Sequence, residues 1–164
     1  MKYLIKFILS IFFTQVAYAQ TGIGIGIYPT GTETGFGFRS GKNSRLIADV
    51  RICKANFFSN QTQSSFITEI SGIYKLVKLE KIRFHLGIGA RSEWNFGGKK
   101  NKYGGVVPIG VEAFPFPFQN AGLFFEAAPF FTHDFERGYY GGIRTVAGFI
   151  FYFPLKEKKQ IKNL

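Results

Sequence analysis

IRFHLGIGARSEW, residues 82–94, alternates two classes of residue along its whole length. The residues that share the parity of Ile82 and Trp94 are apolar or small, whereas those between them are charged, histidine or glycine. A repeat of two residues places the two classes on opposite faces of a β-strand. Such a strand is long for a soluble protein and close to the length of a tilted strand that crosses a bilayer. The fold therefore depends on which face meets water.

An export signal precedes the predicted strands. Lys2 and Lys6 supply a basic start, residues 7–13 form an apolar run, and Ala17-Tyr18-Ala19 is a cleavage site. We therefore predict a cleaved signal peptide over residues 1–19, and loss of its two lysines lowers the formal net charge from +11 to +9. No segment of the mature chain has the roughly 18 uninterrupted apolar residues that a membrane-spanning helix needs.

The alternation recurs along the chain and predicts eight strands. They cover approximately residues 21–29, 34–40, 44–55, 63–76, 81–94, 103–115, 121–133 and 138–153. The short connections are rich in glycine, proline, asparagine and serine, so we expect neighbouring strands to pair antiparallel in chain order. Pro108 and Pro129 predict bulges or irregularity in their strands, because proline cannot donate a backbone hydrogen bond.

One face of the predicted strands carries nearly all of their charges. Five arginines match five carboxylates on it, which indicates ion pairs: Arg39, Asp49, Arg51, Glu69, Arg83, Arg91, Glu93, Glu112, Glu126 and Arg144. The other face is rich in phenylalanine and isoleucine. A soluble, lipocalin-like barrel that binds a small apolar ligand would place the apolar face inside and the charges in water. Glycines on the charged face favour the opposite arrangement, because the inside of a small closed barrel is crowded.

Aromatic residues near the strand ends point to the same arrangement. A barrel that spans a membrane carries aromatic girdles at both interfaces. We expect one girdle from Tyr28, Trp94, Tyr103, Phe131 and Tyr139, and the other from Tyr74, Phe114, Phe116 and Phe153. The apolar face then lies in lipid, and the last strand must pair with the first, since an open sheet edge in hydrocarbon leaves backbone groups unpaired.

The closing segment from Gly148 to Phe153 resembles the last strand of small eight-stranded outer-membrane barrels of the OmpA/OmpX type. The run from Val107 to Phe131 also resembles outer-membrane barrels of diderm bacteria. The resemblance implies an all-β fold, an eight-stranded antiparallel up-and-down transmembrane β-barrel over residues 20–154, in the bacterial outer membrane. It also implies that Gly148, Phe151 and Phe153 form a signal that the outer-membrane assembly machinery reads. Many such barrels end at the last aromatic residue, whereas residues 155–164 here add a basic tail that we expect in the periplasm.

Two activities are open to such a barrel. A porin-like channel is one, but balanced inward charges favour an interior plugged by side chains. A lipid-A-modifying enzyme is the other. A resemblance to outer-membrane barrels that modify lipid A would require a histidine and a serine at the outer rim. Ser92 and His133 fall at this rim, with Asp134 and Glu136 beside the histidine, but an intervening strand would separate them by about 10 Å. Because this exceeds hydrogen-bond reach, we predict no catalytic site.

The remaining motifs predict membrane partners and no cofactor. His85 points inward beside Arg83 and is read as part of the plug, and no cysteine and histidine spacing typical of a metal site occurs. Lys99, Lys100 and Lys102 are expected in an outer loop near lipopolysaccharide phosphates. A pI near 9.8 does not indicate nucleic-acid binding in an exported barrel. We therefore predict a monomeric outer-membrane barrel that maintains the envelope, with membrane lipids, lipopolysaccharide and the assembly machinery as partners.

Overall fold

The structure is a computed structural model that describes residues 22–29, 33–55, 65–95, 100–118, 120–134 and 138–153. The predicted signal peptide over residues 1–19 and the predicted basic tail over residues 155–164 lie outside these ranges. All regular secondary structure within them is β-strand, which confirms the all-β prediction. No helix in the described part of the chain is long and apolar enough to cross a membrane.

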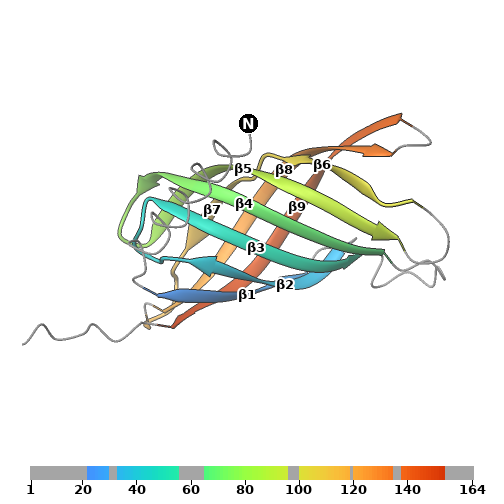
Figure 1. Cartoon of the computed structure of the whole chain (residues 1–164). Coiled ribbons are helices and arrows are strands. Elements are labelled where there is room, and N and C mark those ends of the chain that lie inside the picture. Colours follow the sequence, from blue (N-terminus) through green and yellow to red (C-terminus); the bar gives the residue numbers. More distant parts are fainter. Residues whose placement is uncertain are drawn as a thin grey trace, which may run out of the picture.

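Nine strands follow one another in the part of the chain that the structure describes. They are β1 (Ile23–Pro29), β2 (Glu33–Ser40), β3 (Leu46–Ala55), β4 (Ser65–Lys78), β5 (Ile82–Asn95), β6 (Lys102–Val106), β7 (Ile109–Ala113), β8 (Ala121–Asp134) and β9 (Gly138–Phe153). Pairing is antiparallel throughout and follows chain order, with β6 and β7 both lying between β5 and β8. Because β9 also pairs with β1, the sheet closes into a ring (Figure 1).

The predicted strand over residues 103–115 is two strands in the structure, so the count of eight is corrected to nine. Val106 of β6 pairs with Gly89, and Ile109 of β7 pairs with Leu86, so both segments keep the same register along β5. They are two parts of one passage across the sheet, interrupted at Pro108, whose ring nitrogen has no hydrogen to donate. The ring therefore still has eight passages.

The other proline expectation is wrong. Pro129 lies within β8 opposite Ile143, in a register that runs without a shift, and its carbonyl accepts a hydrogen bond from the Val107 N–H at 2.9 Å. A register shift occurs instead between Lys75 and Val77 of β4. No proline or glycine marks that place in the sequence, so the alternation pattern did not predict it.

The register also gives the tilt and width of the ring. Paired residues lead from Ile27 around the ring to Tyr139 on β9, through Phe36, Ile52, Thr68, Ser92, Tyr103 and His133. In the other direction Ile27 pairs directly with Phe149, so one circuit is offset by the ten residues between Tyr139 and Phe149. With usual strand spacings, this offset over eight passages corresponds to a tilt of about 40° and a backbone radius of about 8 Å. Side chains fill an interior of that size.

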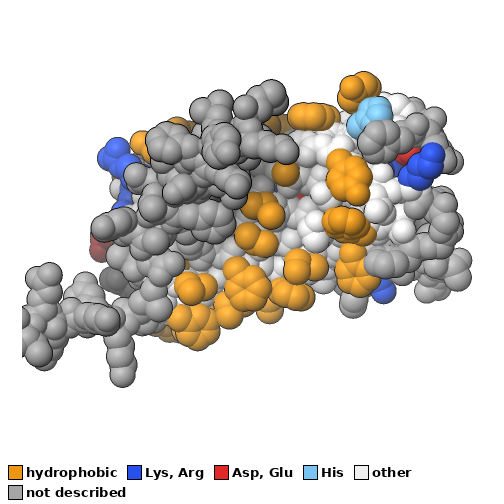
Figure 2. All heavy atoms as spheres, in the orientation of Figure 1, with side chains coloured by type: hydrophobic (Ala, Val, Ile, Leu, Met, Phe, Trp, Pro, Cys, Tyr) orange, Lys and Arg blue, Asp and Glu red, His pale blue; other side chains and the backbone are white. Residues whose placement is uncertain are grey.

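The two faces of the sheet have the polarity that the glycines indicated. The charged face lies inside the ring, and the phenylalanine- and isoleucine-rich face lies outside; Ile88, for example, is 74% exposed. Figure 2 shows such apolar side chains along the outer wall, whereas blue and red side chains gather mainly at the two ends. We call the end that holds Ile23, Phe153 and the connecting residues 41–45, 79–81 and 114–118 the near end, and the opposite one the far end.

The predicted girdles need two corrections. Tyr28 and Phe114 are only 1% and 5% exposed, because they share the inward parity of their neighbours and point into the ring. Trp94, Tyr103, Phe131 and Tyr139 are exposed at the far end, and Tyr74 and Phe153 at the near end. Proximity to a strand end is therefore a weaker guide to orientation than parity is.

Candidate functional site

Arg51 and Glu126 form the centre of a buried ion-pair network inside the ring. The two terminal guanidinium nitrogens of Arg51 donate to the two carboxylate oxygens of Glu126, each at 2.7 Å. Arg51 also donates from Nε to Asp49 at 2.9 Å, and Asp49 accepts from Nε of Arg39 at 2.6 Å. These side chains come from β2, β3 and β8, so the network joins walls of the ring that are not adjacent.

Glu69 is the second centre of the network. It accepts a hydrogen bond from Arg91 at 2.5 Å and two from Arg144, one of them from Nε at 3.1 Å. Arg144 also lies 3.4 Å from a carboxylate oxygen of Glu126, which links the two centres. Arg91 extends the network toward the far end, where it donates to Glu33 at 2.5 Å. Each buried cation in this part of the network therefore has a carboxylate partner, as buried charges require.

Glu112 is less well compensated. The Tyr152 hydroxyl donates to its Oε1 at 2.5 Å, but the nearest cationic atoms, on Arg39 and Arg83, lie 3.9 Å away. Its Oε2 has no hydrogen-bond partner among the described residues, although the side chain is buried. The charge of Glu112 at the near end is therefore less closely paired than the charges of Glu126 and Glu69.

One predicted residue lies outside the buried network. Glu93 is at the far end, 21% exposed, and its Oε1 lies 3.5 Å from Nζ of Lys102. Four polar residues that contact the network or its surroundings were not predicted as sites: Glu33 and Tyr152 bind network members, Lys102 pairs with Glu93, and Lys75 donates to the Lys42 carbonyl. Parity identifies three of them as inward-facing, since Glu33 shares a face with Gly35, Lys75 with Glu69, and Tyr152 with Gly148.

Aromatic and aliphatic side chains fill the rest of the near half. Tyr28, Phe114, Phe124, Val146, Ile150 and Tyr152 form a buried cluster. The guanidinium of Arg51 lies 4.6 Å from the centre of the Tyr28 ring, and that of Arg39 lies 5.3 Å from the centre of the Phe124 ring. These cation–π contacts join the apolar cluster to the ion pairs.

The network leaves little room for water at mid-height. The cavity beside Arg51, Glu69 and Arg144 has a volume of about 10 Å³, at the lower limit for a single water molecule. A larger cavity of about 570 Å³ opens at the far end, where Arg91, Glu93 and Lys102 line it. Beside Arg51, Glu69 and Arg144 the interior therefore has space for about one water molecule.

The predicted assembly signal has a packing role in the structure. Gly148 lies where a methyl group would overlap the Phe124 ring and the Ile27 carbonyl. Phe153 faces outward at the near end, and its ring centre lies 5.0 Å from that of Phe151. Close packing alone thus accounts for the glycine, and reading by the assembly machinery stays a prediction.

The structure does not bring Ser92 and His133 together as a lipid-A-modifying site would require. Ser92 pairs with Tyr103, and Tyr103 pairs with His133, so one strand separates the serine from the histidine as expected. The His133 ring packs against Tyr139 at 4.7 Å, and Glu136 lies outside the described residues. Among the described residues, no group of three or more histidine, cysteine, aspartate or glutamate side chains could hold a metal ion.

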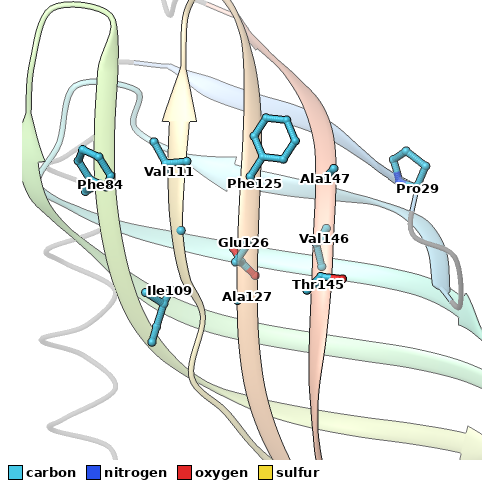
Figure 3. Close-up of a pocket in the computed structure, with 11 residues that line it drawn as sticks. Pro29, Phe84, Ile109, Val111, Phe125, Glu126, Ala127, Thr145, Val146 and Ala147 are labelled. Atoms are coloured by element: carbon cyan, nitrogen blue, oxygen red, sulfur yellow. The ribbon is translucent and has the colours of Figure 1, made fainter.

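The outer wall carries an apolar groove of about 660 Å³. It extends from Phe84 on β5, past Val111 and Phe125, to Pro29 at the end of β1 (Figure 3). Ala127, Thr145 and Ala147 line it with short side chains. Among the described residues that line it, Glu126 alone is charged, and its carboxylate is engaged by Arg51 inside the ring. The groove therefore presents no acid or base for catalysis.

Comparisons with known proteins bear on the fold. No protein-family model matches the sequence, and no curated protein matches it. Among solved structures, the chain is similar to the crystal structure of the N-terminal β-barrel domain of Pseudomonas aeruginosa OprF, with a TM-score of 0.58 and 12% sequence identity. The match covers 82% of this chain and 98% of that one. The ring thus shares the fold of this β-barrel domain, which confirms the predicted resemblance at the level of the fold.

Proposed function

We propose that the mature chain, residues 20–154, is an integral barrel of the bacterial outer membrane with a structural, envelope-maintaining role. The observation that carries this proposal is the inverted polarity of the ring, with buried charges inside and large apolar side chains outside. A soluble barrel of the lipocalin kind has the opposite polarity. The fold shared with the OprF barrel domain supports the same location.

The dimensions of the wall fit this role. β5 has 14 residues, which at a tilt of about 40° span about 35 Å along the barrel axis, and the apolar band of such barrels is about 25 Å tall. The near end faces the periplasm, because a chain exported through a signal peptide enters the outer membrane from that side. Lys100 and Lys102 at the far end then lie close to lipopolysaccharide phosphates.

The interior acts as a plug that holds the wall together. Ion pairs join β3 to β8 and β4 to β9 across the ring, and the cavity between them is at the limit for one water. The carboxylates of this network are held by arginines and are not exposed to a substrate, so they are not placed to act in catalysis. We therefore assign the network to stability and assembly.

Fractionation combined with gel mobility tests the location. The full-length chain, expressed in a diderm host, should fractionate with the outer membrane and resist carbonate extraction. Its gel mobility should differ between boiled and unboiled samples, because a closed barrel resists detergent until heated. Release with the periplasmic contents, together with identical mobility in both samples, would refute the proposal.

Conductance in planar bilayers tests the plug separately. The purified barrel should show no sustained ionic current. The double variant Glu126→Gln with Arg51→Met should show more frequent channel openings. A steady conductance of the unmodified protein comparable to that of a general porin would contradict a closed interior.

A further inference from the structure

Three cationic side chains converge on the β2–β3 turn at the near end. Lys75 donates from Nζ to the Lys42 carbonyl at 2.5 Å, and Arg83 donates from Nη1 to the same carbonyl at 2.6 Å. Lys78 donates to the Asn43 carbonyl at 2.5 Å. Backbone carbonyls satisfy these donors but carry no formal charge, so the positive charge of the group is not neutralised there.

A cavity of about 190 Å³ adjoins this turn. Its polar lining holds three cationic residues, Lys42, Lys81 and Arg83, and one acidic residue, Glu80. Its other side is aromatic, formed by Phe114 and Phe116. One water molecule takes up about 30 Å³ in the liquid, so the cavity has room for a phosphate group. Figure 2 shows blue side chains at this end of the molecule, around the β4–β5 turn.

Arg83 lines the cavity and has a buried donor without a partner in the described part of the chain. Its side chain is only 7% exposed, and its Nε has no hydrogen-bond partner among the described residues. The nearest carboxylate, Glu112, lies 3.9 Å from Nη1, which is beyond hydrogen-bonding distance. A buried guanidinium donor without a partner is uncommon, so the charge of Arg83 is incompletely compensated where this residue borders the cavity.

Lys42 and Arg83 also crowd one aromatic ring. The Arg83 guanidinium lies 4.5 Å and the Lys42 ammonium 4.9 Å from the centre of the Phe114 ring. Partial burial, together with the charge of Arg83, lowers the pKa of Lys42 below its usual value. Two cations on one ring repel each other, and a shared anion would turn this repulsion into attraction.

We propose that this near-end cavity is a binding site for a phosphate group, held by Arg83, Lys42 and Lys81 and flanked by Phe114. The group is either the headgroup phosphate of an anionic lipid or free inorganic phosphate. The lipid source rests on the proposed function, because only a barrel in the outer membrane brings this end to the periplasmic leaflet. The aromatic side of the cavity suits a lipid, whose glycerol and acyl chains continue into the apolar phase.

The test uses the full-length mature barrel refolded in a non-ionic detergent. One arm measures retention of phosphatidylglycerol against phosphatidylcholine by native mass spectrometry. The other arm measures binding of inorganic phosphate by isothermal titration calorimetry, with chloride as the reference anion. The variant is Lys42→Gln with Lys81→Gln. The control, Lys54→Gln, removes a positive charge at the far end, away from this cavity.

We expect the near-end variant to bind phosphate or phosphatidylglycerol at least tenfold more weakly, with the far-end control unchanged. Retention of phosphatidylglycerol without binding of phosphate would assign the site to lipid, and binding of both would show that the phosphate group suffices. Equal binding by wild type and the near-end variant, or binding of neither probe by wild type, would overturn the proposal. Phosphate binding by a protein that fractionates with the periplasm would refute the membrane location but keep the site.

Discussion

Replacing Glu126 by glutamine removes the negative charge at the centre of the interior network. The glutamine keeps the size of the side chain, so the change is electrostatic rather than steric. Arg51 loses a paired contact with both carboxylate oxygens, at 2.7 Å each, and Arg144 loses a carboxylate at 3.4 Å. Both arginines stay buried inside the barrel, where water cannot replace the lost partner.

The expected cost follows from what remains around Arg51. Removing one partner of a buried ion pair costs about 3–5 kcal/mol, because it leaves an uncompensated charge. Asp49 still accepts from Arg51 at 2.9 Å, so we expect the lower end, about 3 kcal/mol. Adding Arg51→Met should cost less than the sum of the two single changes, since the second replacement removes the charge that the first left unpaired.

The assay is equilibrium unfolding in guanidinium chloride, in lipid vesicles at neutral pH. Trp94 is the single tryptophan and faces outward at the far end, so its fluorescence reports the transfer of the barrel from lipid to water. The matched control is Glu93→Gln, which breaks the partly exposed pair with Lys102 at 3.5 Å. Such a pair contributes at most about 1 kcal/mol.

The reasoning fails if the two single variants lose the same free energy of unfolding. Equal losses would mean that water reaches the centre of the barrel and screens its charges as well as it screens those at the rim. Strict additivity in the Arg51→Met and Glu126→Gln pair would be equally damaging, because it would show that the two side chains do not interact.

Three further predictions concern packing, the lipid face and Glu112. Gly148→Ala should slow folding into vesicles and lower stability by about 1–3 kcal/mol, because the new methyl group overlaps the Phe124 ring. Ile88→Lys should cost about 2–4 kcal/mol in vesicles, since the side chain is 74% exposed on the outer wall. Tyr152→Phe should cost about 1–3 kcal/mol by removing the hydroxyl that donates to Glu112.

Each of these has its own comparison. Gly141→Ala is the reference for the glycine, because only one neighbouring atom, at 3.3 Å, is close to the added carbon. A negligible cost of Ile88→Lys in vesicles would argue for water at the outer wall and against the membrane location. An unchanged Tyr152→Phe barrel would mean that solvent already satisfies Glu112.

The strands and the sign of their faces could be predicted because the relevant information is local. Alternation in residues 82–94 sets the two faces, and glycines beside the charges indicate which face is crowded. Which charged residues pair with each other was harder to predict from the sequence. Arg91 contacts Glu33, which is 58 residues away, and Lys102 contacts Glu93 at the rim, so neither pair follows from the even match of five arginines and five carboxylates.

By itself, the sequence determined that this protein consists of long alternating strands in chain order and that its charges share one face. Only the tertiary structure decided which charges meet. The ten-residue offset around the ring sets the height of each strand relative to all others, and it brings Arg51 against Glu126 on a strand that is not its neighbour. That offset belongs to the closure of the whole sheet, so no single strand encodes it. The alternation in residues 82–94 predicts one strand of the barrel wall, and the register at which the sheet closes determines which side chains meet inside the barrel.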